Sequence, residues 1–415
     1  MDSKQSAERR RASDDPLPDF DVFSAEPGIF GWLSKRGSKG RILLVAPLAI
    51  LTIGLLLAQP FEGAIWRDHS VTDLCHDAAH LMGLTRVACY NAPVTTEYPF
   101  MRDILMGAAA IIMAISPFLV YWQWRSLRVV LSGLAKQRLI ARSDQDRSAL
   151  RSEIDKCNRH FARVAKFHGP YAFFGLVAVL AVVYAASKYG VFEIFTPDGA
   201  GTEAGVTNFK GWWANPLLHP VGGLIFISVC SLGVYYILVM NLVGGRVVVA
   251  LWRTRASIEC QADPDNVDGY WGYRNARGVL VPTFTALALH GFALAFVAAS
   301  VPFPLAIVFL LPLLGQWLFV LPFYIGVPSY ILLRDIPHWR EAELEKLGAQ
   351  MRDLKELAAN DLEYSLRVAP IQERVKRVRA VRSLPFRRFQ DGLVVPFTVI
   401  TGLASVYALY LAYRA

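Results

Sequence analysis

The chain has 415 residues, of which 54% are hydrophobic and only 19% are charged, and its mean hydropathy is positive. This balance excludes an ordinary water-soluble globule and indicates an integral membrane protein. The formal net charge of +9 fits either nucleic acid or an anionic membrane surface, so the positions of the charges must decide.

Seven apolar runs come close to the roughly 20 residues that a helix needs to cross the hydrocarbon core of a bilayer. The third run is the shortest, and the sixth contains three prolines, which predict a kink or a tilt. We therefore predict an all-α polytopic membrane protein with seven transmembrane helices, at residues 41–59, 101–124, 170–187, 217–243, 278–300, 305–333 and 393–413.

The lysines and arginines orient these spans, because basic residues stay on the cytoplasmic side during insertion. Threading the seven spans places 37 of the 43 on one side. This predicts a multi-pass protein of the bacterial inner membrane with its N-terminus in the cytoplasm and its C-terminus outside. The same topology explains the net positive charge without a nucleic-acid partner. The expected parts are a disordered tail (1–40), spans one and two (41–124), a cytoplasmic helical hairpin (125–169), spans three to six (170–333), a second cytoplasmic hairpin (334–391) and span seven (392–415).

The first external loop, residues 62–98, contains two cysteines and three histidines. Cys75 and Cys89 either form a disulfide in an oxidising periplasm or remain thiols. His76 and His80 are four residues apart and share one face if the segment is helical, which suits zinc or copper; an amphipathic surface helix with incidental histidines is the favoured alternative. Cys157, Cys230 and Cys260 are expected to be free thiols. Trp212 and Trp213, near the second external loop, resemble an aromatic belt.

The two cytoplasmic segments show helical periodicity. In the first, the sequence "SDQD" at 143–146 is expected to turn the chain and cap a helix whose apolar stripe is Leu150, Ile154, Cys157, Phe161 and Val164. In the second, the basic arm 374–382 is expected to lie near anionic lipid headgroups. We expect the hairpins to pack on each other, and the same periodicity also permits a seam between the copies of a homo-oligomer.

The loop between spans four and five gathers polar residues that could hold a cation or an anion. Asp263, Asp265 and Asp268 offer oxygen ligands and Gly269 permits unusual backbone angles, although their spacing departs from that of a calcium loop. Asp265 with Arg274 or Arg277 would form a metal or anion site. A plain turn built from aspartates and glycines is the alternative.

The same loop resembles an H-P-D-x-x-G-G-x-x-G element of uncharacterised bacterial polytopic membrane proteins, over about ten residues. Pro264, Asp265, Gly269 and Gly272 match that element, whereas Asp263 replaces its histidine and Asp268 its first glycine. The resemblance implies a helical membrane fold and carries no known activity.

Ionisable and polar side chains inside the predicted spans are few, and each is a functional candidate. His290 lies near the middle of span five and Gln316 in span six, and the short connection between these spans predicts a tight antiparallel pair. Together with Thr283 and Thr285 they either line a pore or form hydrogen bonds between helices.

Three functions follow from these observations. A channel or pore gated or assembled through its cytoplasmic helices explains the nearly uncharged spans and the proline-rich sixth span. A sensor that reads an external signal through residues 62–98 is the second interpretation. The third is a membrane-embedded enzyme acting at the inner leaflet on a lipid-borne or phosphorylated substrate, which the sequence favours least because it has no nucleotide-binding or nucleophile motif. No cofactor is indicated.

Overall fold

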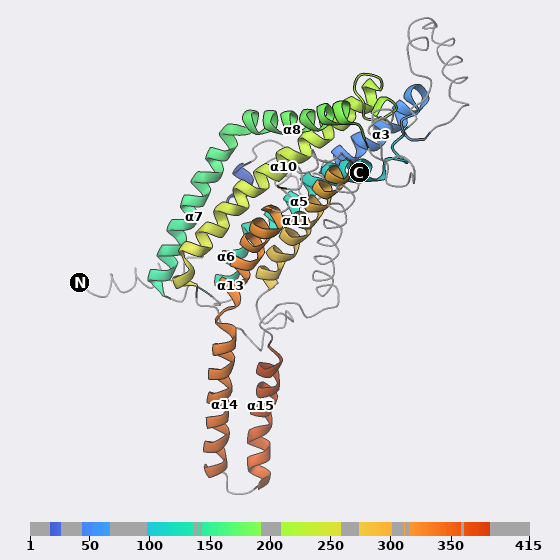
Figure 1. Cartoon of the computed structure of the whole chain (residues 1–415). Coiled ribbons are helices and arrows are strands. Elements are labelled where there is room, and N and C mark those ends of the chain that lie inside the picture. The colour runs from blue at the N-terminus through green and yellow to red at the C-terminus, as the bar shows by residue number, and fades with distance from the viewer. Residues whose placement is uncertain are drawn as a thin grey trace, which may run out of the picture.

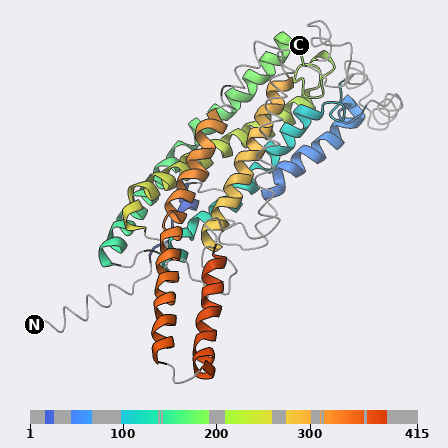
Figure 2. The same cartoon turned by 60° about the horizontal axis from the view of Figure 1, so that its bottom comes forward.

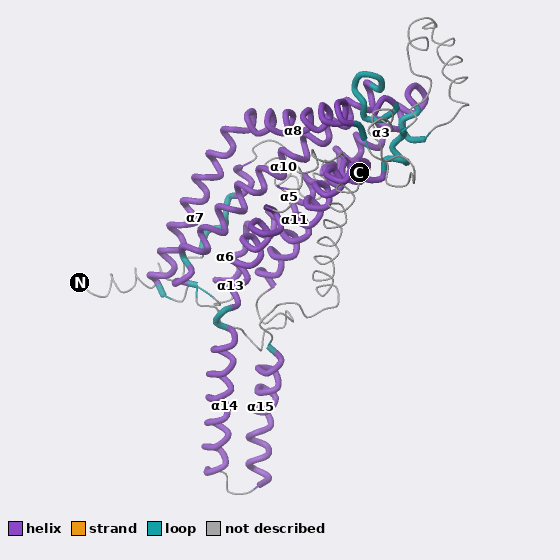
Figure 3. Tube along the Cα trace, viewed as in Figure 1, coloured by secondary structure: helices purple, strands orange, loops and turns teal. Residues whose placement is uncertain are grey.

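The computed structural model contains helices as its regular elements throughout the part of the chain that it describes (Figure 3). The β-type pairing in this part is a single isolated bridge between Tyr98 and Trp212. The all-α prediction is therefore confirmed there. The described residues are 17–25, 44–66, 98–136, 140, 143–191, 209–258, 274–300, 311, 315–357 and 361–381.

Five helical segments are long and apolar enough to cross a membrane: Ile104–Lys136, Asp144–Tyr189, Pro220–Arg253, Arg274–Ser300 and Leu318–Glu356. The first predicted span appears as α3 (Ala46–Glu62), a shorter apolar helix of 17 residues that ends at Gly63 with a left-handed φ of 60°. The seventh predicted span lies outside the described residues. The structure thus supports a multi-pass membrane protein, and its five candidate segments coincide with predicted spans two to six.

The centre of the bundle is α10 (Pro220–Arg253), which packs against helices on several sides (Figure 1). Its 34 residues span roughly 51 Å at 1.5 Å per residue, more than the ~30 Å hydrocarbon core of a bilayer. One part of α10 therefore extends beyond that core. Its neighbours are α3, α8 (His168–Tyr189), α7 (Asp144–Val164) and α5 (Ile104–Arg128), which continues through α6 (Val130–Lys136).

A second long contact joins α5 to α11 (Arg274–Ser300), which packs along it over much of its length. Buried apolar side chains form two clusters along the bundle. One cluster, with Trp124 and Phe161, lies toward the end from which α14 (Ile336–Leu357) and α15 (Asp361–Ala380) project; we call this the hairpin end. The other, with Trp212 and Trp213, lies toward the opposite end, which we call the tryptophan end.

The capped amphipathic helix predicted after residue 143 is confirmed as α7. The Ser143 hydroxyl accepts the backbone N–H of Asp146 at 3.0 Å, and every residue of the predicted apolar stripe is buried. A short 3-10 turn, η3 (Ala165–Phe167), joins α7 to α8, whose outer face is apolar and exposed as lipid contact requires. The stripe packs against α10 and against the N-terminal segment rather than against α14 and α15.

That N-terminal segment departs from the predicted disordered tail at 1–40. Residues 17–25, which end in the 3-10 turn η1 (Val22–Ala25), pack into the cluster at the hairpin end, where Phe20 is 1% exposed. The prediction rested on the polar composition of residues 1–28 as a whole and overlooked the short apolar motif inside them. The rest of the tail lies outside the described residues.

The proline-rich sixth span is irregular, as its prolines predict. The π-helical turns η5 (Gln316–Val320) and η6 (Pro322–Gly326) lead into α13 (Val327–Leu333) and then α14. A proline cannot donate to the helical ladder, which favours such shifts in register. Beyond the bundle, α14 and α15 lie side by side and project together (Figures 1 and 2). The remaining short element is η4 (Arg255–Ser257), at the end of α10.

Candidate functional site

Two buried polar pairs connect α5 and α11, and we call these four side chains the polar seam. The Ser116 hydroxyl lies 3.0 Å from His290 Nε2, and the Gln123 amide donates to Thr283 Oγ1 at 3.0 Å. All four residues are at most 3% exposed. Within each helix the two members are seven residues apart, about two turns, so the pairs follow one another along the same helix interface.

Prolines flank the polar seam on both helices. Pro117 follows Ser116 in α5, and Pro282 precedes Thr283 in α11. Because a proline leaves one carbonyl of the preceding turn without its helical donor, nearby hydroxyls commonly compensate inside a membrane. The carbonyl that Pro117 leaves without a donor is that of Met113, whereas the Ser116 hydroxyl lies 3.1 Å from the carbonyl of Ile112, one residue earlier. The helix-helix interpretation of the intramembrane polar residues thus accounts for Thr283 and His290.

A cavity of about 20 Å³ lies at the hairpin end of the polar seam, with room for about one water molecule. Gln123 and Thr283 contribute its polar lining, and α10, α11 and η6 supply mostly apolar neighbours. Among the described residues none lies in hydrogen-bonding distance of Gln123 Oε1 or His290 Nδ1, although both atoms are buried. The seam therefore retains unused hydrogen-bonding capacity at both of its pairs.

Tyr324 of η6 forms one wall of this cavity. Its ring lies against Gly244 and Gly245 of α10, so close that a Cβ on Gly244 would stand 2.8 Å from Tyr324 Cε1. Its hydroxyl donates to the backbone carbonyl of Asn241. The glycines thus create the space that lets the sixth-span segment approach α10, and Tyr324 occupies it.

The other residues singled out from the sequence do not join the seam. Thr285 donates to Val281 O of its own helix at 3.0 Å. Gln316 begins η5, and its side chain lies outside the description. Arg274 is the exposed first residue of α11, three residues before Arg277. The predicted loop, metal and disulfide residues lie outside the described residues: Asp263, Asp265, Asp268 and Gly269; His76 and His80; Cys75 and Cys89.

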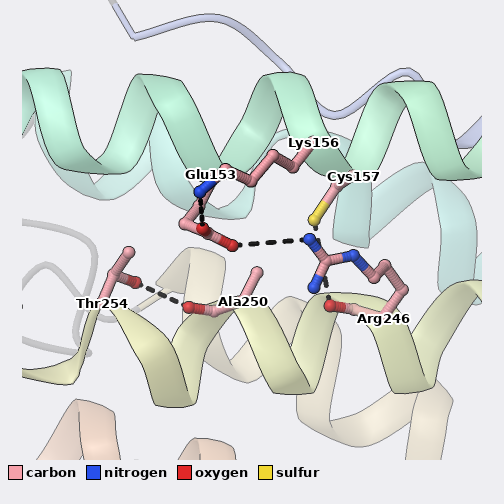
Figure 4. A network of polar contacts seen from close by, with 6 residues as sticks. All are labelled: Glu153, Lys156, Cys157, Arg246, Ala250 and Thr254. Carbon is pink, nitrogen blue, oxygen red and sulfur yellow. Dashed lines mark hydrogen bonds and ion pairs between the residues drawn. The ribbon is translucent and has the colours of Figure 1, made fainter.

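A charged cluster joins α7 to α10 at the hairpin end, and we call it the charged clasp (Figure 4). Glu153, which is 9% exposed, accepts a hydrogen bond from Lys156 Nζ at 2.6 Å and lies 3.5 Å from Arg246 of α10. Burial raises the pKa of Glu153, but the hydrogen bond from Lys156 and the charges of Lys156, Arg246 and Arg253 outweigh it and hold that pKa below its usual 4.5. The carboxylate therefore stays ionised.

Cys157 lies beside the charged clasp and points toward α10, where its thiol contacts the backbone carbonyl of Arg246 at 3.8 Å (Figure 4). Burial raises the pKa of this thiol to about 11, so it is neutral at physiological pH. Cys157 and Cys230 are both buried free thiols, which confirms the prediction for these two.

At the tryptophan end, two buried carboxylates accept hydrogen bonds from backbone N–H groups at helix N-termini. Asp103 caps α5 and accepts the indole N–H groups of Trp212 and Trp213 at 2.7 and 2.8 Å. Glu62 accepts the first backbone N–H groups of α10, from Val221 at 2.9 Å and Gly222 at 3.0 Å. The aromatic-belt interpretation of the two tryptophans is wrong, because both are fully buried in this cluster.

Sequence reasoning missed Ser116, Gln123 and Tyr324. The sequence contained a signal for the first two, since Ser116 and Gln123 are polar residues inside a predicted span, as His290 is. Tyr324 gave no such signal, because its role depends on the approach of α10.

Comparison of the chain with protein-family models, with curated proteins and with solved structures gives no match. Within the described residues no group of three or more His, Cys, Asp and Glu is placed to hold a metal ion.

Proposed function

We propose that this chain is a membrane channel or pore protein whose path follows the polar seam and whose opening is controlled by the segment 316–381. The observation that carries this proposal is the line of buried polar side chains between α5 and α11, which ends at a cavity walled by Tyr324. Amides, hydroxyls and imidazoles replace the hydrogen bonds of water inside a bilayer, which a path for water or small polar species requires.

The position of Tyr324 suggests how such a path is closed. Its ring fills the space above Gly244 and Gly245, and the segment that carries it continues through α13 into α14. Arg334, between α13 and α14, donates to the carbonyl of Arg255 at 2.9 Å and so ties this segment to the end of α10. Because η6, α13 and α14 are continuous, a displacement of α14 that breaks this contact would move Tyr324 relative to α10. The hairpin end is the cytoplasmic end in this proposal, as the distribution of basic residues predicts.

Flux of water and ions through purified protein in liposomes, measured together with the mass of the purified oligomer, tests this proposal. Tyr324→Ala should raise the flux over the unmodified protein because it removes the wall of the cavity. Gln123→Leu in the Tyr324→Ala background should reduce it again, because the seam then loses its amide. Thr285→Val is the matched control and should leave the flux unchanged, since the Thr285 hydroxyl donates to a carbonyl of its own helix. Folded Tyr324→Ala protein that conducts no better than empty liposomes would contradict the channel.

A sensor of external signals is the second candidate, and the anchoring of the loop 67–97 favours it. Phe100 and Met101, just after this loop, donate backbone hydrogen bonds to Ala64 and Ile65, just before it, at 2.8 and 3.0 Å. Glu62, next to this anchor, contacts the start of α10, and α10 extends to the charged clasp. A sensor predicts no flux from any variant, and it predicts that replacing residues 67–97 by a Gly-Ser linker changes the reactivity of Cys157 at the other end of α10.

A further inference from the structure

Residues 17–25 lie in a groove between α5–α6 and α7, parts of the chain that are distant from them in sequence. Phe20 packs edge-to-face on Phe161 of α7, and Phe23 packs on Tyr121 and Trp124 of α5. Five of the nine residues are buried at 9% exposure or less, among them Val22 at 0%. The segment therefore lies between α7 and α5, with an aromatic side chain directed to each.

Polar contacts fix the register of the segment. Asp19 accepts the Ser132 hydroxyl and lies 3.4 Å from Arg128. The Phe20 N–H donates to the carbonyl of Arg128 at 3.0 Å, and the Asp21 N–H donates to the side chain of Asn158 on α7 at 2.8 Å. The segment is thus held by two of its own backbone N–H groups, by Asp19 and by two aromatic side chains, the combination by which a short non-helical peptide binds to a groove.

We propose that the groove between α5–α6 and α7 is a peptide-binding groove, and that its occupant is residues 17–25 of this same chain, acting as a separable strap. The strap covers one side of α7, while the charged clasp and the Cys157 contact hold α7 to α10 on another. When the strap leaves, Phe161 loses the ring of Phe20, and among the described elements α7 keeps its contacts to α10, η3 and η4. This inference is independent of whether the chain conducts.

The experiment uses the full chain in detergent, with a protease site placed between Ala25 and Leu44 and cut after folding. The N-terminal fragment should remain bound to the cut protein, and an excess of a synthetic peptide of residues 15–27 should displace it. A Phe20→Ala peptide should bind at least tenfold more weakly, because its anchor on Phe161 is lost. The Ser24→Ala peptide is the matched control and should bind within about twofold, since that hydroxyl contacts only Asp21 within the strap.

Labelling of Cys157, read by peptide mass spectrometry, reports on α7 itself. Removing the fragment should raise the labelling rate at least tenfold, and adding the peptide should restore protection. A fragment that never exchanges with excess peptide would show an integral core element and overturn the proposal, as would a fragment that leaves without any change at Cys157. If cutting unfolds the protein, the uncut chain decides: Phe20→Ala must raise Cys157 labelling relative to Ser24→Ala, and equal rates would overturn the strap.

Discussion

Ser116 Oγ on α5 lies 3.0 Å from His290 Nε2 on α11, and neither side chain is more than 1% exposed. His290, the clearest ionisable residue inside a predicted span, is therefore one member of an interhelical pair. Both partners belong to the two helices that pack most extensively on each other. The pair therefore combines a structural role with a position on the proposed path, and stability and flux measurements separate the two.

Ser116→Ala should destabilise the protein by about 0.6–2 kcal/mol, because His290 Nε2 then loses its partner inside the bundle. A double-mutant cycle with His290→Leu should show a coupling free energy of the same size, measured by reversible unfolding in mixed micelles. Thr285→Val, also on α11, should cost less than about 0.5 kcal/mol, since its hydroxyl bonds to its own helix. Additive effects of Ser116→Ala and His290→Leu would show that the two side chains do not interact.

Gly222→Ala should destabilise the tryptophan end by about 1–3 kcal/mol. A Cβ at this position would stand 2.0 Å from the backbone carbonyl of Trp213, which cannot move aside cheaply because Asp103 holds the indole of the same residue. Thermal unfolding followed by tryptophan fluorescence measures the loss. Gly348→Ala in α14 is the control, since nothing lies within 4 Å of its Cβ, and it should be neutral or stabilise by up to about 1 kcal/mol. Equal melting temperatures for the two variants would refute the close approach.

Glu153→Gln should destabilise the protein at neutral pH by about 1–3 kcal/mol, because Lys156 and Arg246 lose a charged acceptor. The pKa of Glu153 is lower in the folded protein than its ordinary value of 4.5, so its ionised form stabilises the fold above that pH. The advantage of the unmodified protein over Glu153→Gln should therefore be constant near neutral pH and shrink as the pH falls below 4.5. Chemical unfolding across this range measures it, and a difference that grows on acidification would contradict the clasp.

Cys157 should resist maleimide at neutral pH in the folded protein, because it is buried and its pKa is raised to about 11. Asp155→Cys, two residues away on the exposed face of α7, should label at the rate of a free thiol. Peptide mass spectrometry after timed labelling distinguishes the sites, and denaturation should make Cys157 reactive. Rapid labelling of Cys157 in the folded chain would show that α7 is not held against α10. The same experiment without reductant tests the predicted Cys75–Cys89 disulfide.

Periodicity and charge were sufficient for the features that depend on local sequence. The stripe of α7 could be predicted because burial of one helical face imposes a repeat of three and four residues, and its cap because Ser143 and Asp146 are neighbours in the chain. The long apolar helices could be predicted because a bilayer sets their length and composition. His290 and Thr283 could be selected as candidates because polar groups are costly inside a bilayer.

The sequence by itself determined that the described part of this chain is an all-helical membrane protein, where five of its long apolar helices lie, and that His290 and Thr283 are polar side chains in need of partners. Only the tertiary structure decided which residues pair: Ser116 with His290, Gln123 with Thr283, and Arg246 with Glu153. It also decided that residues 17–25 pack in the groove beside α7. The physical reason is that helix periodicity fixes the face a residue occupies, whereas the partner depends on how distant helices are arranged and on the glycines that allow them to approach.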